Sequence, residues 1–87
     1  MNARTKAIEV LSYRLADAAI AFVSYGDFPS IDSAIDGVIN GLDDNTQVDI
    51  TLGTEGHGSW TRYDFQGFGD DDKLALRKQI TAIVAAA

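Results

Sequence analysis

The chain contains no cysteine, and it has only one proline, one histidine and one tryptophan among its 87 residues. The absence of cysteine excludes disulfide bonds and thiolate chemistry, and it is typical of proteins from a reducing compartment. With a single histidine as well, the chain has few of the side chains that zinc sites and nucleophilic enzymes use. The composition therefore weighs against a metal protein and against an enzyme.

Long hydrophobic runs are also missing. Glu9, Arg14 and Asp17 interrupt the apolar residues near the N-terminus, so that segment has neither a continuous signal-peptide core nor the length of a membrane span. The tail ITAIVAAA is too short to anchor the chain in a bilayer. We expect a soluble, cytoplasmic protein with one domain that covers residues 1–87.

Positive charge is scarce in the middle of the chain. Between Leu15 and Asp72 there are twelve acidic residues and one base, Arg62, whereas the rest of the chain carries six bases and one acid. The net charge is −6. Such a middle is a poor nucleic-acid binder, because affinity for a duplex comes largely from lysine and arginine. It is a plausible surface for a basic partner, or it only keeps the protein soluble.

Apolar residues at helical spacing predict two helices in the first half of the chain. The stripe of the first helix comprises Ile8, Leu11, Leu15, Ala18, Ala19 and Phe22, with Arg4 and Tyr25 as extensions. Gly26 is expected to end this helix, and Ile20, Ala21 and Val23 give it a second apolar flank. Pro29 separates it from the second helix, which Ser30 caps and in which Gly37 either weakens the helix or permits close packing against the first one.

After a polar loop over 43–47, the apolar period changes to two. Val48, Ile50 and Leu52 alternate with polar residues, and so do Thr61, Tyr63 and Phe65, which predicts a hairpin around a turn at 54–58. A last helix is expected to start with Asp70 or Asp71 as N-cap and to bury Leu76, Ile80, Ile83 and Val84. The predicted fold is α+β in the order α-α-β-β-α. Three helices pack on a two-stranded antiparallel hairpin, whose open edges dimerisation would extend.

The turn GTEGHGSW holds the only histidine and the only tryptophan. Glu55 and Ser59 flank His57 as in a hydrolase, but a glycine-rich hairpin tip does not hold catalytic groups in place. A pH-sensitive contact and a plain turn residue stay open for His57, and the turn residue is favoured. A calcium loop from Asp43 fails, because Val48 replaces its glycine and Thr54 its last ligand. We predict no catalytic residue, no metal and no cofactor.

In size, acidity and lack of cysteine, the chain resembles the small proteins with which phages and mobile elements block host machinery, anti-CRISPR proteins among them. This resemblance implies a non-enzymatic inhibitor that docks on a basic surface, one that otherwise binds nucleic acid. The candidate partner-binding residues are Asp32, Asp36, Asp43, Asp44, Asp49, Trp60, Arg62 and Asp64.

Trp60 is the most informative of these candidates. The alternation places it beside Arg62 on the strand face opposite Tyr63 and Phe65, and tryptophan and arginine are enriched at interface hot spots. Alternatively, it covers the back of the hairpin or turns inward at a bulge near Gly58. Two other functions stay open for the whole chain: a structural or regulatory homodimer, and a small metal-binding or enzymatic protein.

Overall fold

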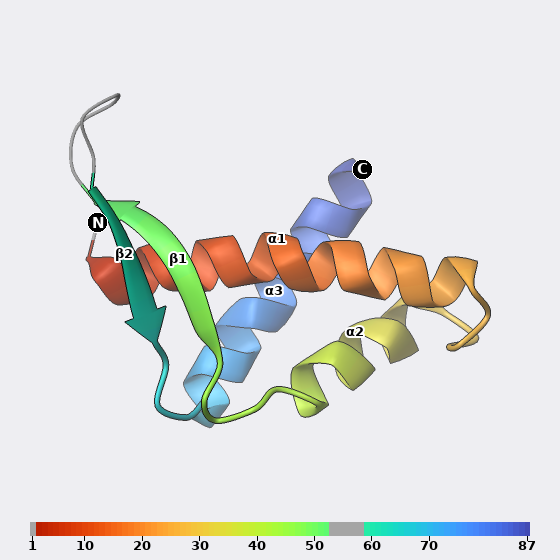
Figure 1. Cartoon of the computed structure of the whole chain (residues 1–87). Coiled ribbons are helices and arrows are strands. Elements are labelled where there is room, and N and C mark those ends of the chain that lie inside the picture. Colours follow the sequence, from red (N-terminus) through yellow and green to blue (C-terminus); the bar gives the residue numbers. More distant parts are fainter. Residues whose placement is uncertain (1, 53–58) are drawn as a thin grey trace.

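The computed structural model describes residues 2–52 and 59–87, except for the side chains of Leu52, Ser59 and Trp60. It confirms the predicted α+β order α-α-β-β-α (Figure 1). The elements are α1 (Ala3–Ser24), α2 (Ile31–Asn40), β1 (Gln47–Leu52), β2 (Ser59–Asp64) and α3 (Asp70–Ala86). Among the described residues, no helix is long and apolar enough to cross a membrane.

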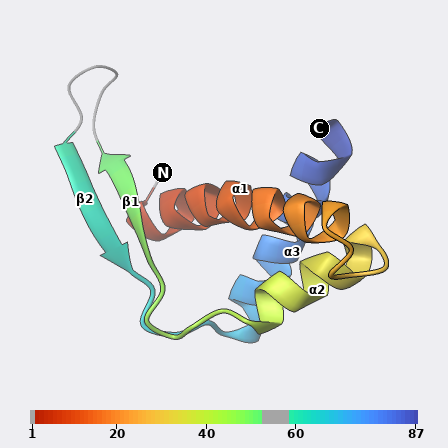
Figure 2. The same cartoon turned by 45° about the vertical axis from the view of Figure 1, so that its right-hand side comes forward.

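Helix α1 lies at the centre of the fold. It contacts both strands and both other helices, and it is the helix against which the hairpin packs (Figures 1 and 2). Its buried residues are Ala7, Ile8, Leu11, Ser12, Leu15, Ala16 and Ala19. The one polar side chain in this group, Ser12, donates a hydrogen bond to the carbonyl of Ile8 at 2.7 Å, so no buried polar atom is left unsatisfied there.

The C-terminus of α1 ends as the sequence predicts. Gly26 has φ +80°, and its N–H bonds to the Val23 carbonyl at 3.0 Å, while the N–H of Asp27 bonds to the Phe22 carbonyl at 2.9 Å. This is the Schellman arrangement, which glycine permits because it adopts positive φ without strain. The predicted apolar stripe does not continue to this end, because Phe22 is 38% exposed and Tyr25 is 80% exposed.

Helix α2 begins with the predicted cap. The Ser30 hydroxyl accepts a hydrogen bond from the Ser33 N–H at 3.2 Å, and the Ser33 hydroxyl accepts one from the Ser30 N–H at 3.3 Å. This reciprocal pair satisfies two backbone donors at the start of the helix. The helix then buries Ala34, Ile35 and Ile39 against the core.

Gly37 of α2 lies directly under the ring of Phe28. A Cβ atom added at Gly37 would lie 2.8 Å from Cε1 of that ring and closer still to its tip. Phe28 in turn makes an edge-to-face contact with Phe22 of α1, with ring centroids 5.8 Å apart. The close packing that Gly37 permits is therefore with Phe28, which stands between α2 and the end of α1.

This contact predicts opposite effects of one substitution in two backgrounds. With Phe28→Ala in place, Gly37→Ala should stabilise the protein by about 1 kcal/mol, because alanine is the better helix former. With Phe28 present, displacement of its ring costs about 1–3 kcal/mol, which cancels that gain or turns it into a net loss. Urea unfolding of the four variants measures the difference, and an equal effect of Gly37→Ala in both backgrounds would contradict the packing described here.

The hairpin has the predicted faces. β1 and β2 pair antiparallel, with Val48 opposite Tyr63 and Asp49 opposite Arg62. Val48 and Ile50 are buried, Tyr63 is half-buried, and Phe65 is buried just beyond the end of β2. The apolar face of the hairpin therefore lies on α1, and the face that carries Asp49 and Arg62 is exposed.

The two loops that flank the hairpin run side by side (Figure 2). The N–H of Phe65 donates to the Thr46 carbonyl at 3.1 Å, and the N–H of Gly67 donates to the Asp44 carbonyl at 2.9 Å. Gln66 and Gly67 both have positive φ, which turns the chain away from the strand toward α3. These bonds hold the α2–β1 loop and the β2–α3 loop together.

Helix α3 begins at Asp70, with Gly69 as its N-cap. The prediction of Asp70 or Asp71 as the N-cap was therefore wrong by one or two residues. Gly69 is the last residue in the extended conformation, and its N–H donates to the carboxylate of Asp72 at 3.1 Å. The predicted inner face is confirmed, because Leu76 and Ile80 are fully buried and Ile83 and Val84 pack at the edge of the core.

Candidate functional site

Among the described residues, three aspartates form ion pairs with arginine and the other aspartates form none. Asp36 pairs with Arg77, Asp49 with Arg62 at 3.2 Å, and Asp72 with Arg4 at 2.5 Å. In each pair an arginine compensates the negative charge. Two of the predicted partner-binding aspartates, Asp36 and Asp49, are therefore less available to a basic partner than the sequence suggests.

Asp49 and Arg62 form their pair across the exposed face of the hairpin. Both side chains are more than half exposed, so the pair contributes at most about 1 kcal/mol and opens easily for a competing group. Trp60 pairs through its backbone with Thr51, but its side chain lies outside the described residues. The prediction for Trp60 thus stays a prediction. His57 and the turn around it also lie outside the described residues.

Two other predicted residues, Asp44 and Asp64, come together where the two loops meet, and a third, Asp43, is next to Asp44 in the α2–β1 loop. Asp44 and Asp64 line one shallow hollow of about 220 Å³, together with Asn45, Gln47 and Gln66. Asp43 precedes this hollow and accepts a hydrogen bond from the Asn45 N–H at 2.8 Å. The hydrogen bonds between the two loops therefore place Asp44 and Asp64, which are about twenty residues apart in the sequence, on one surface.

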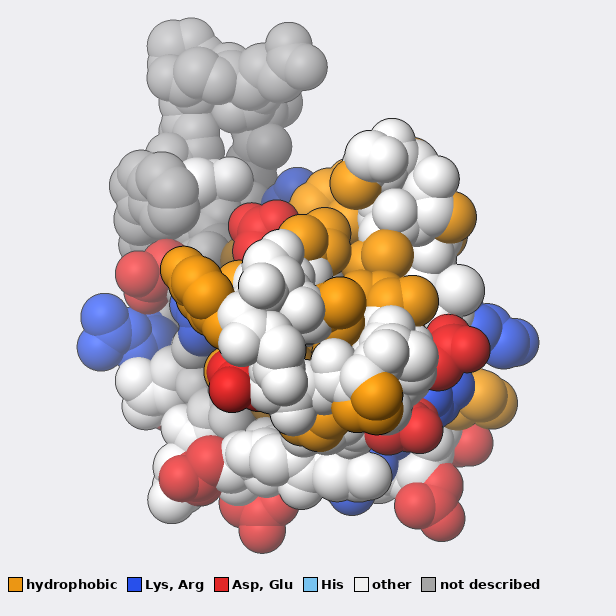
Figure 3. Space-filling model, turned by 90° about the vertical axis from the view of Figure 1, so that its right-hand side faces the viewer, with side chains coloured by type: hydrophobic (Ala, Val, Ile, Leu, Met, Phe, Trp, Pro, Cys, Tyr) orange, Lys and Arg blue, Asp and Glu red, His pale blue; other side chains and the backbone are white. Residues whose placement is uncertain are grey.

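Asp70 and Asp71 extend this surface from the first turn of α3. They follow closely after Gly67, whose N–H bonds to Asp44, and both are exposed. We call the five residues the acidic end: Asp43, Asp44, Asp64, Asp70 and Asp71. Figure 3 shows acidic side chains along the lower edge of the molecule, at the level of the two loops in Figure 1. Within 2–52 and 59–87, none of the five has an ion pair.

Sequence reasoning missed Asp70 and Asp71 as members of this surface, because it assigned the aspartate run to helix capping. Only the hydrogen bonds between the two loops show that the start of α3 lies near Asp44. Asp32 stands apart from the group. It is exposed in the first turn of α2, at the other end of a ten-residue helix from the loop that holds Asp43. That helix is about 15 Å long.

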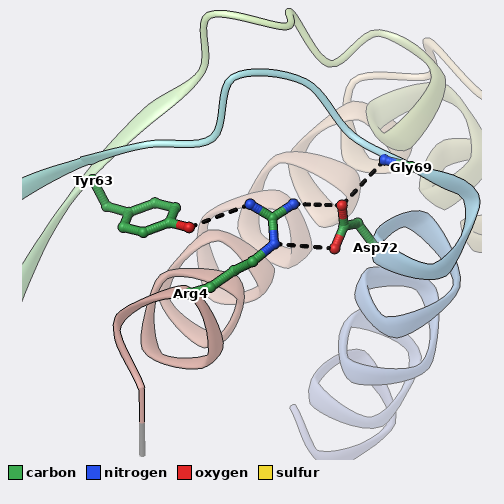
Figure 4. Close-up of polar contacts among 4 residues, drawn as sticks. All are labelled: Arg4, Tyr63, Gly69 and Asp72. Atoms are coloured by element: carbon green, nitrogen blue, oxygen red, sulfur yellow. Dashed lines mark hydrogen bonds and ion pairs between the residues drawn. The ribbon is translucent and has the colours of Figure 1, made fainter.

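A second polar cluster fixes the start of α3 (Figure 4). Arg4 of α1 donates from Nη2 and Nε to the two oxygens of Asp72, at 2.5 and 3.4 Å, and from Nη1 to the Tyr63 hydroxyl at 3.3 Å. The guanidinium also lies 5.6 Å from the ring centroid of Phe65. Arg4 thereby joins α1, β2 and α3, and it orients the turn that carries Asp70 and Asp71.

Arg4 and Asp72 each stabilise the charged form of the other. The hydrogen bonds from Arg4 lower the pKa of Asp72 below its ordinary value, the Gly69 N–H acts in the same direction, and partial burial opposes both. The same contact raises the pKa of Arg4. The sequence offers one signal that Arg4 has an acidic partner. Arg4 lies on the apolar stripe of the predicted first helix, and a charged side chain at such a position needs a counterion.

Over the described ranges, no three histidine or acidic side chains are placed so that they could hold a metal ion. Comparison of the chain with protein-family models, with curated proteins and with solved structures gives no match in any of the three.

Proposed function

We propose that this chain is a non-enzymatic interaction protein that docks on a basic surface of another protein through its acidic end. The observation that supports this is the separation of charges. Three aspartates are compensated by arginine, whereas five others lie in the α2–β1 loop, at the end of β2 and in the first turn of α3, and none of them has an ion pair within the described parts of the chain. Such a group of exposed carboxylates steers and orients a partner of opposite charge.

The acidic end is held in shape before any partner binds. Backbone hydrogen bonds join Asp44 to Gly67 and Thr46 to Phe65, and the Arg4 cluster fixes the first turn of α3. Preorganisation of this kind lowers the entropic cost of association. The surface is therefore suited to recognition rather than only to solubility.

The partner that fits best is a protein whose basic surface otherwise binds the phosphates of nucleic acid. Clustered carboxylates would occupy the same lysine and arginine side chains that phosphates neutralise. Binding would then block access of the nucleic acid, in the manner of an anti-CRISPR-like inhibitor. We further propose that the protein acts in the cytoplasm, which agrees with the absence of cysteine.

Two variants of equal net charge test the role of the acidic end. In the first, Asp43, Asp44 and Asp64 are changed to asparagine. In the second, the exposed residues Asp17, Asp27 and Asp32 are changed instead. An arginine-rich peptide is the probe, and titration calorimetry at low and moderate salt measures its affinity. We expect the first variant to bind about tenfold more weakly than the second, a difference of about 1.4 kcal/mol.

Equal weakening of both variants would contradict the proposal, because net charge alone would then account for binding. The same pair serves in a pull-down from the native cell at low and high salt. A specific partner should be retained by the second variant, lost by the first, and released by salt, since exposed charges are screened within about 8–10 Å at physiological ionic strength.

A further inference from the structure

The outer edge of β2 is an open strand edge in the described parts of the chain. β2 pairs with β1 on one side, and Figure 2 shows it at the outer side of the hairpin, with β1 between it and the helices. Among the described residues, β1 and α1 are the only elements that contact β2. An open edge is a template for a further strand, because its outward N–H and C=O groups have no partner in the sheet.

Arg62 and Asp64 direct their backbone groups to this open edge. In an antiparallel pair, residues that bond across the pair alternate with residues whose N–H and C=O point outward. The bond from the Phe65 N–H to the Thr46 carbonyl continues the register of the hairpin, so Tyr63 bonds inward and its two neighbours point outward. Within the described residues, no group hydrogen-bonds to the backbone of Arg62 or Asp64 from that side.

The opposite edge of the hairpin, along β1, is closer to α1. Arg14 of α1 donates a hydrogen bond at 3.4 Å to the Gln47 carbonyl, which points outward from β1. Helix α1 also contacts β1 more extensively than it contacts β2. An added strand therefore has better access to the edge of β2 than to the edge of β1.

We propose that the open edge of β2 is the interface of a symmetric dimer, in which β2 pairs antiparallel with β2 of a second copy. A two-fold axis perpendicular to the sheet passes between two identical residues. With Tyr63 opposite Tyr63 of the second copy, Arg62 of each copy lies opposite Asp64 of the other. Each Arg62–Asp64 pair then exchanges both of its backbone hydrogen bonds, and the two hairpins join into one continuous sheet.

Charge complementarity identifies a second copy as the occupant of this edge. Arg62 and Asp64 are both exposed, on the hairpin face that carries Asp49. Within the described residues, Arg62 bonds to Asp49 through Nε alone, at 3.2 Å, so its two Nη groups are available to Asp64 of the second copy. Opposite charges directly across an antiparallel pair stabilise it. The symmetric register supplies this contact twice.

The same two side chains disfavour other registers and other strands. A shift of two residues in one direction places Arg62 opposite Arg62 of the second copy, and a shift in the other direction places Asp64 opposite Asp64. Both alternatives bring like charges together, which destabilises the pair. A uniformly basic strand from another protein would face Arg62 with like charge, whereas β2 is complementary to itself.

The dimer does not depend on the proposed function. It compensates Asp64 and leaves the other four members of the acidic end free of the contact. Because the two β2 strands are antiparallel, the acidic ends of the two copies point in opposite directions along the strands. Self-association is therefore measured without any docking partner.

Sedimentation velocity tests the dimer by a charge swap. The unaltered chain should pass from monomer toward dimer between low and high micromolar concentration. Arg62→Asp and Asp64→Arg should each raise the dissociation constant at least about tenfold, because each places like charges opposite each other at both pairs. An equimolar mixture of the two variants should dimerise again, because every pair in the mixed dimer joins opposite charges.

Lys78→Asp and Asp27→Arg are the matched controls. They change the net charge by the same amounts, and both residues are exposed and lie outside the hairpin. Each should self-associate like the unaltered chain, and mixing them should have no effect. The proposal is overturned by an unaltered chain that stays monomeric, by equal weakening in both sets of variants, or by folded charge-swap variants that stay monomeric when mixed. Circular dichroism shows whether each variant is folded.

A cysteine cross-link tests the register independently of the charge-swap variants. The chain has no cysteine of its own, so Arg62→Cys copies are mixed with Asp64→Cys copies under mild oxidation, which leaves the other Arg62–Asp64 pair of the dimer intact. Directly opposite residues of a bonded antiparallel pair have Cα atoms about 5.5 Å apart, a distance that suits a disulfide.

The covalent dimer should form at least about ten times faster from this mixture than from Thr51→Cys copies mixed with Asp64→Cys copies. Thr51 is exposed too, but it lies on β1, away from the open edge. Equal rates in the two mixtures, or no covalent dimer from the first, would place the contact elsewhere and overturn the proposal.

Discussion

Leu76→Ala is expected to lower the free energy of unfolding by about 3–4 kcal/mol, because it removes three buried carbons and leaves a cavity that the core does not refill. Leu76 is fully buried in the core cluster, on the face of α3 that packs against the centre of the fold. An 87-residue domain has a total stability of about 4–13 kcal/mol, so this single loss is a large part of it. The melting temperature should fall by about 12–30 °C.

Leu74→Ala provides the matched control on the same helix. Leu74 is 53% exposed, and leucine and alanine are both good helix formers, so the change should cost less than about 0.5 kcal/mol. Urea unfolding followed by circular dichroism measures both variants, with equal slopes as the sign that only stability changed. Similar losses for the two variants would show that α3 does not face the core with Leu76.

The contrast between Leu74 and Leu76 also illustrates what the sequence can predict. The faces of α3 and of both strands follow from apolar periodicity, which is a local signal, and the structure confirms them. The same holds for the end of α1 at Gly26 and the start of α2 at Ser30. At both positions the backbone conformation or the cap depends on residues within one turn.

Features that depend on distant residues were not predictable in this way. Arg4 and Asp72 are 68 residues apart, and only the packing of α3 beside the start of α1 brings them together. The start of α3 was misplaced for a related reason. Three consecutive aspartates are all acceptable caps locally, and the choice of Gly69 as N-cap follows from the path of the preceding loop.

The candidate site likewise has one part that the sequence predicts and another part that depends on contacts between distant residues. The sequence identified Asp43, Asp44 and Asp64 as candidates from charge alone, without an indication that they share a surface. Hydrogen bonds between the two loops supply that indication and add Asp70 and Asp71. The ion pairs could not be predicted from the sequence either, because Asp36 contacts Arg77 only where α2 packs against α3.

The ion pair between Arg4 and Asp72 predicts a specific dependence of stability on pH. The pKa of Asp72 is lowered in the folded protein, so folding favours its ionised form. The contribution is complete above the unfolded pKa of about 4, and it is lost as the pH falls through the lower, folded pKa. We expect about 1–2 kcal/mol from this network, reduced from the value of a buried pair because both side chains are partly exposed.

Asp72→Asn should therefore lose about 1–2 kcal/mol of stability at neutral pH and lose less than the unaltered protein on acidification. Asp71→Asn is the control, because Asp71 lies in the same first turn of α3 and takes part in no ion pair within the described residues. It should lose only the interaction with the helix dipole, about 0.3–1 kcal/mol. Urea unfolding at neutral pH and at about pH 3, below the ordinary carboxyl pKa, compares the three proteins.

The difference between the two variants then isolates the contacts of Asp72 with Arg4 and Gly69. If Asp72→Asn and Asp71→Asn have the same stability at neutral pH and the same decline on acidification, the network does not hold the start of α3. If they differ as expected, the turn that carries Asp70 and Asp71 is fixed from α1, sixty-eight residues away from Asp72 in the sequence. The shape of the acidic end would then depend on Arg4, which is not one of the five residues that form it.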